Sequence, residues 1–425
     1  MSETDLTREE KKKLRRAQVK NRQNMIHRVI TIIVLGVIAV GILWTLIAKD
    51  KTYSEVENRM LAQKPELTWS NLISGKFMTD MEDYITDQFF LRNQWIEIKT
   101  VEDIVIGKRE SNGVYIGKGG YLLEIQDEPD NENIIKTSQA IADFSAKHSD
   151  LNQVMTLVPN AAYICDQLRP IAAPVHDQSE EISLVRDMVG DALTFVNLTD
   201  TLKAHKTEGI YYKTDHHWTS LGAMYAYEAL IPALKIENAS TDYTAYPVTH
   251  DFRGTLASTS GFTSSKDTIN IYVYNDSSLD SLVTYVEEET KTASIYDSSA
   301  LEQKDKYEVF FGGNHMRVDI QTPKAPERTL LILKDSYANC FVQFLLPYYN
   351  NIIIIDPRYY YDDLDKLISD KNVTDILYLY NVSTFVDDTS LADVLNNAGS
   401  QTGTASEDST DAAQEVADEG ESEIS

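Results

Sequence analysis

The longest apolar run in the chain lies near its start and predicts a membrane span. Residues 29–48, VITIIVLGVIAVGILWTLIA, form a stretch of twenty residues without a formal charge. At about 1.5 Å per residue, this length covers the hydrocarbon core of a bilayer, which is about 30 Å thick. A cleaved signal peptide would need small residues at a cleavage site, and the following LIAKDKTYSE offers no such pattern. We therefore expect an uncleaved helix.

The charges around this run predict its orientation. Eight Lys and Arg residues lie between positions 11 and 28. Because basic residues are retained on the cytoplasmic side, residues 1–28 are predicted to be a basic cytoplasmic tail. The chain is then a single-pass protein of the cell membrane, with its N-terminus in the cytoplasm and everything after the span outside it. Apolar residues spaced three and four apart between positions 76 and 107 indicate a helical juxtamembrane region over 49–110.

Short apolar runs then alternate with helical patterns, which is typical of an α/β protein. Runs rich in Ile, Leu, Val and Tyr lie at 153–159, 194–198, 329–333, 351–356 and 375–380. Helical candidates lie at about 219–234, 337–346 and 362–369. Nearly continuous apolar strands are expected where both faces of a parallel sheet are buried. We predict a doubly wound parallel sheet in a domain over residues 111–396.

Two segments depart from this alternation. Residues 240–325 are richer in Thr, Ser, Tyr and Asp, and TINIYVYN and KYEVFFGG predict strands within them. We interpret this stretch as a mostly β insertion. Residues 397–425 are acidic and almost free of large apolar side chains, so this tail is predicted to be disordered.

Charge and cysteine content exclude some functions. The 425-residue chain has a formal net charge of −27, and an acidic protein repels the phosphates of DNA and RNA. We therefore expect no nucleic-acid partner. The two cysteines, Cys165 and Cys340, are too few for a disulfide framework, and their apolar surroundings predict buried small side chains. Whether they pair stays open at this point.

Ser336 is the first candidate for chemistry. The strand predicted at 329–333 ends just before LysAspSer, and a helical pattern follows. A serine at such a turn presents its hydroxyl at the carboxyl edge of the sheet, beside the free N–H groups of a helix start. The alternative is that Ser336 or Asp335 only caps the helix.

The segment 214–219, ThrAspHisHisTrpThr, supplies the groups that would activate a serine. A nucleophilic serine needs an imidazole to take its proton and a carboxylate to orient that imidazole. In an extended chain Asp215 and His217 share one face, while His216 points away. Helix capping by Asp215, Thr214 or Thr219 is one alternative. A metal site that adds the distant His315 is another, although three consecutive side chains do not easily converge on one ion. We predict no metal.

Several motifs resemble a known family. DHHW at 215–218 and KDSYAN at 334–339 are similar to motifs of the DHHW family of extracytoplasmic bacterial proteins. SEVENRMLAQKPEL, DYITDQFFLRNQWI, NGVYIGKGGYLLE, FFGGNH and DPRYY look like further blocks, so the resemblance covers most of residues 53–386. That family is related to SGNH-type polysaccharide O-acetyltransferases, including the alginate O-acetylation proteins. The resemblance implies an SGNH hydrolase-like sheet with a circularly permuted motif order, because Ser336 follows the Asp–His pair.

The same resemblance assigns roles to individual residues. It makes Ser336 the nucleophile, His217 the general base and Asp215 its orienting carboxylate. Asn381, at the end of the strand 375–380, resembles the oxyanion-hole asparagine of SGNH proteins, although a turn asparagine is an equal alternative. The chain departs from the superfamily at Lys334, where a glycine is usual.

Two further residues are candidates for contact with the substrate. Arg358 is a candidate for binding a carbonyl or a sugar hydroxyl, with a salt bridge to Asp356 as the default. Trp218 is expected to pack beneath the histidine and is a weaker candidate for a sugar platform.

Together these features predict a membrane-anchored serine acyltransferase that O-acetylates a cell-surface or secreted polysaccharide through an acyl-serine intermediate. No cofactor is expected. Because acetyl-CoA stays in the cytoplasm, the resemblance implies a membrane-bound O-acyltransferase as the partner that delivers acetyl groups. One alternative is a carbohydrate esterase with the same triad and water as the acceptor. Another is a non-catalytic glycan-binding or scaffold protein of the cell envelope.

Overall fold

The structure is a computed structural model that describes residues 8–54, 59–126, 128–275 and 279–399. The chain divides into two compact units, Met1–Ile106 and Gly107–Ser425. The predicted disordered tail lies almost entirely outside the described residues.

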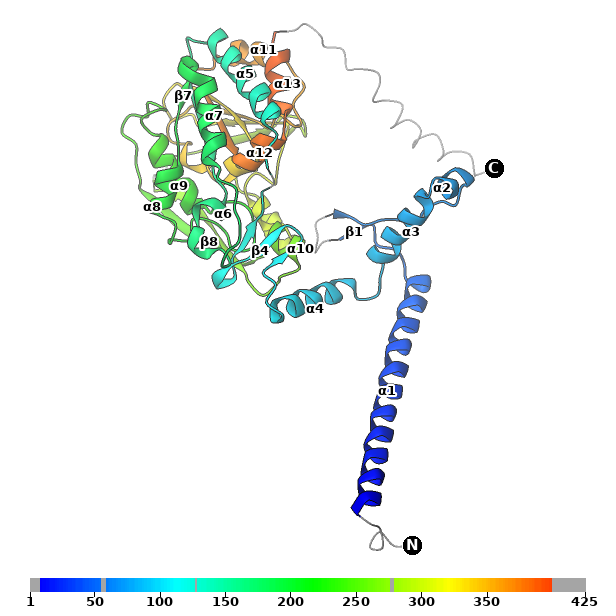
Figure 1. Ribbon diagram of the computed structural model, residues 1–425. Helices are drawn as coiled ribbons and strands as arrows, with labels where there is room; N and C mark the ends of the chain where they lie inside the picture. Colours follow the sequence, from blue (N-terminus) through cyan, green and yellow to red (C-terminus); the bar gives the residue numbers. More distant parts are fainter. Residues whose placement is uncertain (1–7, 55–58, 127, 276–278, 400–425) are drawn as a thin grey trace. The chain divides into compact units, whose positions relative to one another are not determined.

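The first unit contains one helix that is long and apolar enough to cross a membrane, among the residues that the structure describes. Helix α1, Arg8–Ile47, includes most of the predicted span, and its candidate membrane segment is Val19–Gly41. This segment begins ten residues before the predicted span of residues 29–48 and ends seven residues before its last residue, so the two overlap at residues 29–41. Figure 1 shows α1 as one uninterrupted helix.

The rest of the first unit consists of short elements. Its remaining strands and helices are β1 (Tyr53–Ser54), β2 (Arg59–Met60), α2 (Trp69–Ile73), α3 (Lys76–Asp87) and α4 (Arg92–Val105). Helices α3 and α4 lie where the three- and four-residue apolar spacing predicts them.

The second unit is built on an eight-stranded mixed sheet with the strand order β11-β10-β12-β14-β13-β15-β6-β7. Its parallel strands are β6 (Asn152–Val158), β7 (Thr194–Phe195), β13 (Thr329–Lys334), β14 (Asn351–Ile355) and β15 (Asp375–Asn381). These are the five apolar runs, so the predicted parallel α/β sheet is confirmed in its central part. Strand β7 is shorter than predicted.

Strand residues alternate between two separate hydrophobic cores, which explains the nearly continuous apolar runs. In β13, Leu331 and Leu333 pack in the core on the side of helices α5 (Asn131–Lys147) and α7 (Ser179–Val189). Leu330 and Ile332 pack on the other side, in the core that includes α9 (Ser220–Leu230). Burial of both faces is the reason that polar residues are rare in these strands.

Three helices from the C-terminal part of the chain pack on the same side of the sheet as α5 and α7. Helices α11 (Leu364–Lys371), α12 (Val382–Asp387) and α13 (Ser390–Asn397) contribute to the same core as α5 and α7. Figure 1 shows α12 and α13 close to α5.

The segment predicted as a β insertion divides into two parts. Strands β8 (Tyr243–Phe252) and β9 (Asp267–Tyr274) form an antiparallel pair of their own. The short helix α10 (Thr255–Ser260) lies between them in the chain. Strands β10 (Leu282–Tyr285), β11 (Thr290–Thr292) and β12 (Arg317–Gln321) instead extend the central sheet in antiparallel fashion beyond β14.

Two local predictions were wrong. KYEVFFGG is not a strand but contains the 3₁₀ segment η6, Lys306–Val309, in which Asp305 caps the N-terminus. The helix predicted at 337–346 is replaced by two 3₁₀ segments, η7 (Ser336–Cys340) and η8 (Val342–Phe344). Both stretches are densely apolar, and such short runs do not distinguish a strand or an α-helix from a buried tight turn.

A three-stranded antiparallel sheet lies at the start of the second unit. Its strands are β3 (Glu110–Ser111), β4 (Val114–Ile116) and β5 (Leu122–Glu124), with a 3₁₀ turn at Lys118–Gly120. Strands β4 and β5 and the turn between them make up most of the NGVYIGKGGYLLE block. The backbone N–H of Leu122 donates to the carbonyl of Lys213 at 2.7 Å, so β5 lies beside the DHHW segment.

Candidate active site

Ser336 lies at the carboxyl edge of the central sheet. Strand β13 ends at Lys334, and its parallel neighbour β15 ends at Asn381 on the same edge. Asp335 caps the turn that follows, because its carboxylate accepts the N–H of Tyr337 at 2.9 Å and that of Asn381 at 2.7 Å. The capping alternative therefore applies to Asp335, and the Ser336 hydroxyl is left for another partner.

The DHHW segment is held in place by a carboxylate from a distant strand. Asp267 on β9 accepts the backbone N–H groups of Lys213 and Thr214, each at 2.8 Å, and the Thr214 hydroxyl at 2.6 Å. An isolated bridge between Tyr211 and Trp218 closes the segment into a loop. The loop is a bent turn rather than the extended chain assumed from the sequence. Thr219 caps the helix that follows by accepting the N–H of Gly222.

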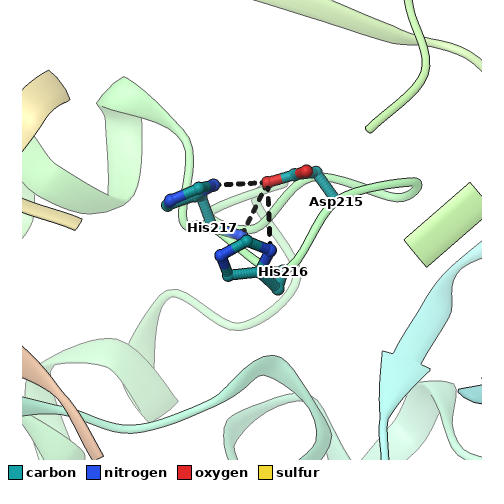
Figure 2. A group of neighbouring side chains, drawn as sticks. All are labelled: Asp215, His216 and His217. Carbon is teal, nitrogen blue, oxygen red and sulfur yellow. Dashed lines mark hydrogen bonds and ion pairs between the residues drawn. The ribbon is translucent and has the colours of Figure 1, made fainter. Parts of the chain in front are cut away.

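The fold brings Asp215, His217 and Ser336 together. His217 Nε2 lies 2.7 Å from Ser336 Oγ, and His217 Nδ1 lies 2.5 Å from Asp215 Oδ1 (the latter pair in Figure 2). An ionised carboxylate can only accept hydrogen bonds, so Nδ1 carries the proton and Nε2 presents its lone pair to the serine hydroxyl. This is the tautomer that a general base needs.

Asp215 is kept ionised although it is only 2% exposed. Its Oδ1 also accepts the His217 N–H at 3.0 Å, and its Oδ2 accepts the Thr255 N–H at 2.9 Å and the Thr255 hydroxyl at 3.2 Å. Burial alone would raise the pKa of this carboxyl. The interactions with His216 and His217, including the hydrogen bonds from His217, outweigh burial and hold the pKa well below its usual range.

Two tyrosine rings, those of Tyr307 and Tyr337, contact the imidazole of His217. The Tyr307 ring stacks on His217 with centroids 4.0 Å apart, and its hydroxyl donates to the Ser336 carbonyl at 3.1 Å. The Tyr337 hydroxyl donates to the carbonyl of His216. These contacts connect the histidine loop to the serine turn, so the two halves of the site cannot move independently.

The prediction that Trp218 is a sugar platform was wrong. Its side chain is 0% exposed, its Nε1–H donates to the Tyr337 carbonyl at 2.8 Å, and it packs on Tyr337 and Phe341. A residue without exposed surface cannot contact a substrate. Trp218 instead supports the serine turn from inside the core, as the packing expectation stated.

Asn381 lies near the serine, but its amide is already engaged. The Nδ2 group donates to the Val158 carbonyl at 2.9 Å and to Asn160 Oδ1 at 3.0 Å, and Oδ1 accepts the Ser383 N–H at 3.0 Å. Both of its N–H donors are therefore occupied, and in this arrangement the side chain offers none to an oxyanion.

Arg358 and Lys334 form a charged group around Asp356. Arg358 donates from Nε and Nη2 to the two oxygens of Asp356 at 2.8 and 2.6 Å, which is the default salt bridge expected from the sequence. Lys334 Nζ is buried and donates to Asn314 Oδ1 at 2.9 Å, with Asp356 at 3.5 Å. Burial lowers the pKa of Lys334, which Asp356 partly opposes.

Asp215, His216 and His217 are also the one group of metal-ligand type that the described residues contain (Figure 2). Contrary to the expectation from an extended chain, their ligand atoms lie within 4.8 Å of one another. Both ring nitrogens of His217 are already engaged, however, and His216 Nδ1 lies 2.8 Å from the Thr255 hydroxyl. His315 instead contacts Glu288 and the Phe311 carbonyl. A metal would have to displace the contact between histidine and serine.

Sequence reasoning missed the residues that support this site. Gly254, Thr255 and Asp267 hold the DHHW segment, and Tyr307 holds both its histidine and the serine turn. They come from segments in which the sequence shows no chemical motif: Asp267 begins β9, Thr255 begins α10 and Tyr307 lies in η6. Asn160 is different, because it lies two residues after the end of β6, at the carboxyl edge of the sheet. Functional side chains gather at this edge, so the position could have identified Asn160 as a candidate site residue. Cys165 and Cys340 are both buried and unpaired with each other, as their apolar surroundings suggested.

A serine, a histidine and an aspartate at the edge of a parallel-rich sheet define an α/β protein with a triad-like site. A family model described as DHHW protein matches residues 176–355, a range that includes all three residues. The match confirms the resemblance to the DHHW family that the motifs indicate.

Solved structures show the same fold. A DHHW family protein from Eubacterium siraeum has a TM-score of 0.58 and 24% identity, with 68% of this chain and 96% of that chain covered. Bacillus cereus PatB1 with a sulfonyl adduct has a TM-score of 0.54 and 21% identity, covering 64% and 95%. The O-acetyltransferase domain of Pseudomonas putida AlgJ has a TM-score of 0.41 and 12% identity, covering 67% and 99%, a likeness too remote to bear on fold or function. No curated protein matches the chain.

Gly254 provides a test of how the aspartate is positioned. A Cβ at this residue would lie 2.1 Å from Asp215 Oδ2 and 2.3 Å from Asp215 Cβ, although its φ of −84° suits any residue. We expect Gly254→Ala to displace the carboxylate and lower the free energy of unfolding by about 1–3 kcal/mol. Thr255→Ser, which keeps both donors to Asp215, should change it by less than about 0.5 kcal/mol. Urea denaturation of the wild type and both variants measures the free energy of unfolding. A Gly254→Ala variant as stable as the wild type would contradict the packing argument.

Proposed function

We propose that this protein is a membrane-anchored serine acyltransferase that O-acetylates a cell-surface or secreted polysaccharide. The observation that carries the proposal is the continuous hydrogen-bonded line from Asp215 through His217 to the Ser336 hydroxyl, at 2.5 and 2.7 Å. The three groups come from two segments more than a hundred residues apart, and the proposed protonation states are those of a nucleophile, a base and an orienting carboxylate.

The proposed reaction has two halves. His217 Nε2 takes the proton of Ser336 as Oγ bonds to the acyl carbon of the donor. Collapse of the tetrahedral intermediate expels the donor's leaving group, which receives the proton from His217 and leaves an acyl-serine. A hydroxyl of the acceptor sugar then gives its proton to Nε2 and attacks the acyl carbon. As the bond from the acyl carbon to Ser336 Oγ breaks, Nε2 returns the proton to Oγ. The products are the acetylated sugar and free Ser336.

The developing oxyanion needs donors, and the sequence candidate for this role is otherwise occupied. The Ser336 N–H is at the first position of η7, where no intrahelical acceptor exists, and we assign it to the oxyanion. Arg358 is the second proposed hydrogen-bond donor to the oxyanion. Its Nη1 makes no hydrogen bond to any residue that the structure describes, while Nε and Nη2 hold Asp356. Arg358 also interacts electrostatically with Asp335, the neighbour of the serine.

The acceptor and donor follow from the resemblance to the DHHW and alginate O-acetylation families. A polysaccharide outside the cytoplasm cannot meet acetyl-CoA directly. The proposal therefore includes a membrane-bound O-acyltransferase that passes acetyl groups across the bilayer to Ser336. The protein itself would need no cofactor, because acyl transfer uses only the serine, the base and the oxyanion donors.

A sulfonyl fluoride probe tests the triad. The wild-type chain should be modified at Ser336, and Ser336→Ala should abolish modification at that peptide. We expect His217→Ala to lower kcat/KM for a small acetyl ester by roughly 10³-fold or more, and Asp215→Asn by roughly 10²- to 10⁴-fold through the wrong tautomer. His315→Ala is the matched control, since His315 contacts Glu288 instead, and it should stay within about twofold. Unchanged ester turnover in His217→Ala would refute the assignment.

The choice between transfer and hydrolysis needs a separate experiment. The full-length protein in detergent is given a small acetyl ester together with an oligosaccharide acceptor, and the products are resolved by mass spectrometry. We expect acetylated oligosaccharide whose formation requires Ser336. Release of acetate alone, at a rate that the acceptor does not change, would instead identify a carbohydrate esterase.

The anchor is tested by fractionation. If α1 spans the cell membrane with its N-terminus in the cytoplasm, the full-length chain should resist alkaline carbonate extraction, and external protease should degrade the second unit in intact spheroplasts. A variant that lacks residues 1–49 should be lost from the membrane fraction in the same extraction. Complete protection of the second unit from external protease would reverse the proposed orientation.

A further inference from the structure

A cavity of about 470 Å³ lies in the second unit beside the β4–β5 hairpin, and the triad does not use it. Residues from the hairpin and from the chain before α7 line it: Tyr115, Ile125, Gln126, Glu128, Pro174, Val175, His176, Asp177 and Glu180. This volume is within the range of small-molecule sites, about 300–1,000 Å³. The Tyr115 hydroxyl donates to the Pro174 carbonyl at 3.0 Å, which ties the two walls together.

The lining combines apolar surface with polar groups that lack partners. Tyr115, Ile125 and Val175 offer the apolar part. Gln126 Nε2 is buried, and it makes no hydrogen bond within the part of the chain that the structure describes. Glu181 Oε2 is also buried and makes no hydrogen bond to the described residues. Glu181 does not itself line the cavity, and its other oxygen, Oε1, contacts the lining residue His176. A buried donor without an acceptor costs free energy unless a ligand or water meets it. Sugars present both apolar faces and hydroxyl acceptors.

A hydrogen-bond network connects this cavity to the serine. Gln178 Nε2 donates to Gln126 Oε1 on the cavity wall and to Asn160 Oδ1 at 3.0 Å, and Gln178 Oε1 accepts the Asn160 N–H at 2.8 Å. Asn160 Oδ1 also accepts from Asn381 Nδ2, and the Asn381 N–H donates to Asp335, the neighbour of Ser336. The cavity wall and the serine turn are thus joined by buried, fully engaged amides.

The surface between the two sites is polar and partly exposed. Asn160 Nδ2 donates to Glu124 Oε2 and to Ser383 Oγ, each at 2.9 Å. Glu124 lies on β5, two residues before Gln126, and it interacts electrostatically with His216 and Asp215. Glu124, Ser383, His216 and Ser336 all keep some exposure to solvent. A chain of sugar units that passes from the cavity to the serine would meet hydroxyl, carboxylate and imidazole groups along its way.

The charge of this surface selects among glycans. Glu128, Asp177 and Glu180 are exposed carboxylates on the cavity, and Glu124 adds a fourth toward the serine. The imidazole of His176 is the lining group that can carry a positive charge, and it is paired with Glu181. Carboxylates repel an anionic ligand and tolerate a neutral or cationic one.

We propose that this cavity is a subsite for the acceptor glycan and that it takes a sugar unit without negative charge, either neutral or carrying an amine. The subsite rests on the proposed acyl transfer, for which it supplies the acceptor. The Asn160 network keeps the distance between the bound sugar and Ser336 constant, so the acetyl group is placed at a fixed position along the glycan.

Filling the cavity tests the subsite. In the full-length protein, Val175→Trp should lower kcat/KM for acetyl transfer to a neutral N-acetylglucosamine tetramer at least about tenfold, through KM. Hydrolysis of a small acetyl ester, which needs only the triad, should stay within about twofold. Ile171→Trp is the matched control, because Ile171 lies on the same loop, is 94% exposed and does not line the cavity. Equal transfer by Val175→Trp and Ile171→Trp would overturn the subsite.

Direct binding separates the subsite from the reaction. Calorimetry with the Ser336→Ala variant should show binding of the N-acetylglucosamine tetramer and of its deacetylated, cationic form, and at least about tenfold weaker binding of a uronic acid tetramer. Adding Val175→Trp should remove the binding. If wild-type protein turns over no acetyl ester but this binding pattern holds, the reaction is wrong and the subsite stands. Preference for the uronic acid tetramer would overturn the subsite's charge selectivity.

Discussion

The contact between His217 Nε2 and the Ser336 hydroxyl is the interaction on which the proposed chemistry of this protein depends. A serine hydroxyl is a poor nucleophile until a base removes its proton, and a neutral imidazole is a competent base only when its other nitrogen is held protonated. Asp215 performs that second task because it is buried, ionised and hydrogen-bonded on both oxygens. Every other feature of the site acts on the position of these three groups.

The scaffold positions the two halves of the site by different means. The serine is placed by topology, since the parallel strands β13, β15 and β6 all end at one sheet edge. The histidine loop has no regular structure and is placed by side chains instead. Asp267 holds its backbone, Thr255 holds its carboxylate, and Tyr307 bridges it to the serine turn. Such a loop is rigid only while these distant contacts persist.

The sequence predicts the triad because its members lie in motifs whose spacing has direct chemical meaning. The parallel strands are equally predictable, since burial on both faces demands apolar residues at every position. The supporting residues are not, because Gly254, Thr255 and Tyr307 reach the site only through tertiary packing. Trp218 was misassigned since sequence cannot distinguish an aromatic residue under a site from one on its surface. His216 was misplaced because the loop is bent, which directs its ring toward Asp215.

Covalent chemistry at Ser336 can be observed directly. The full-length protein is mixed with a small acetyl ester, quenched in acid within milliseconds to seconds and digested, and the peptides are read by mass spectrometry. A competent triad predicts that one acetyl group accumulates on the peptide that contains Ser336 and is absent from the His217→Ala variant. Ester turnover without any acetyl group on that peptide, or with equal acetylation in both proteins, would contradict a reaction through the Asp215–His217–Ser336 line.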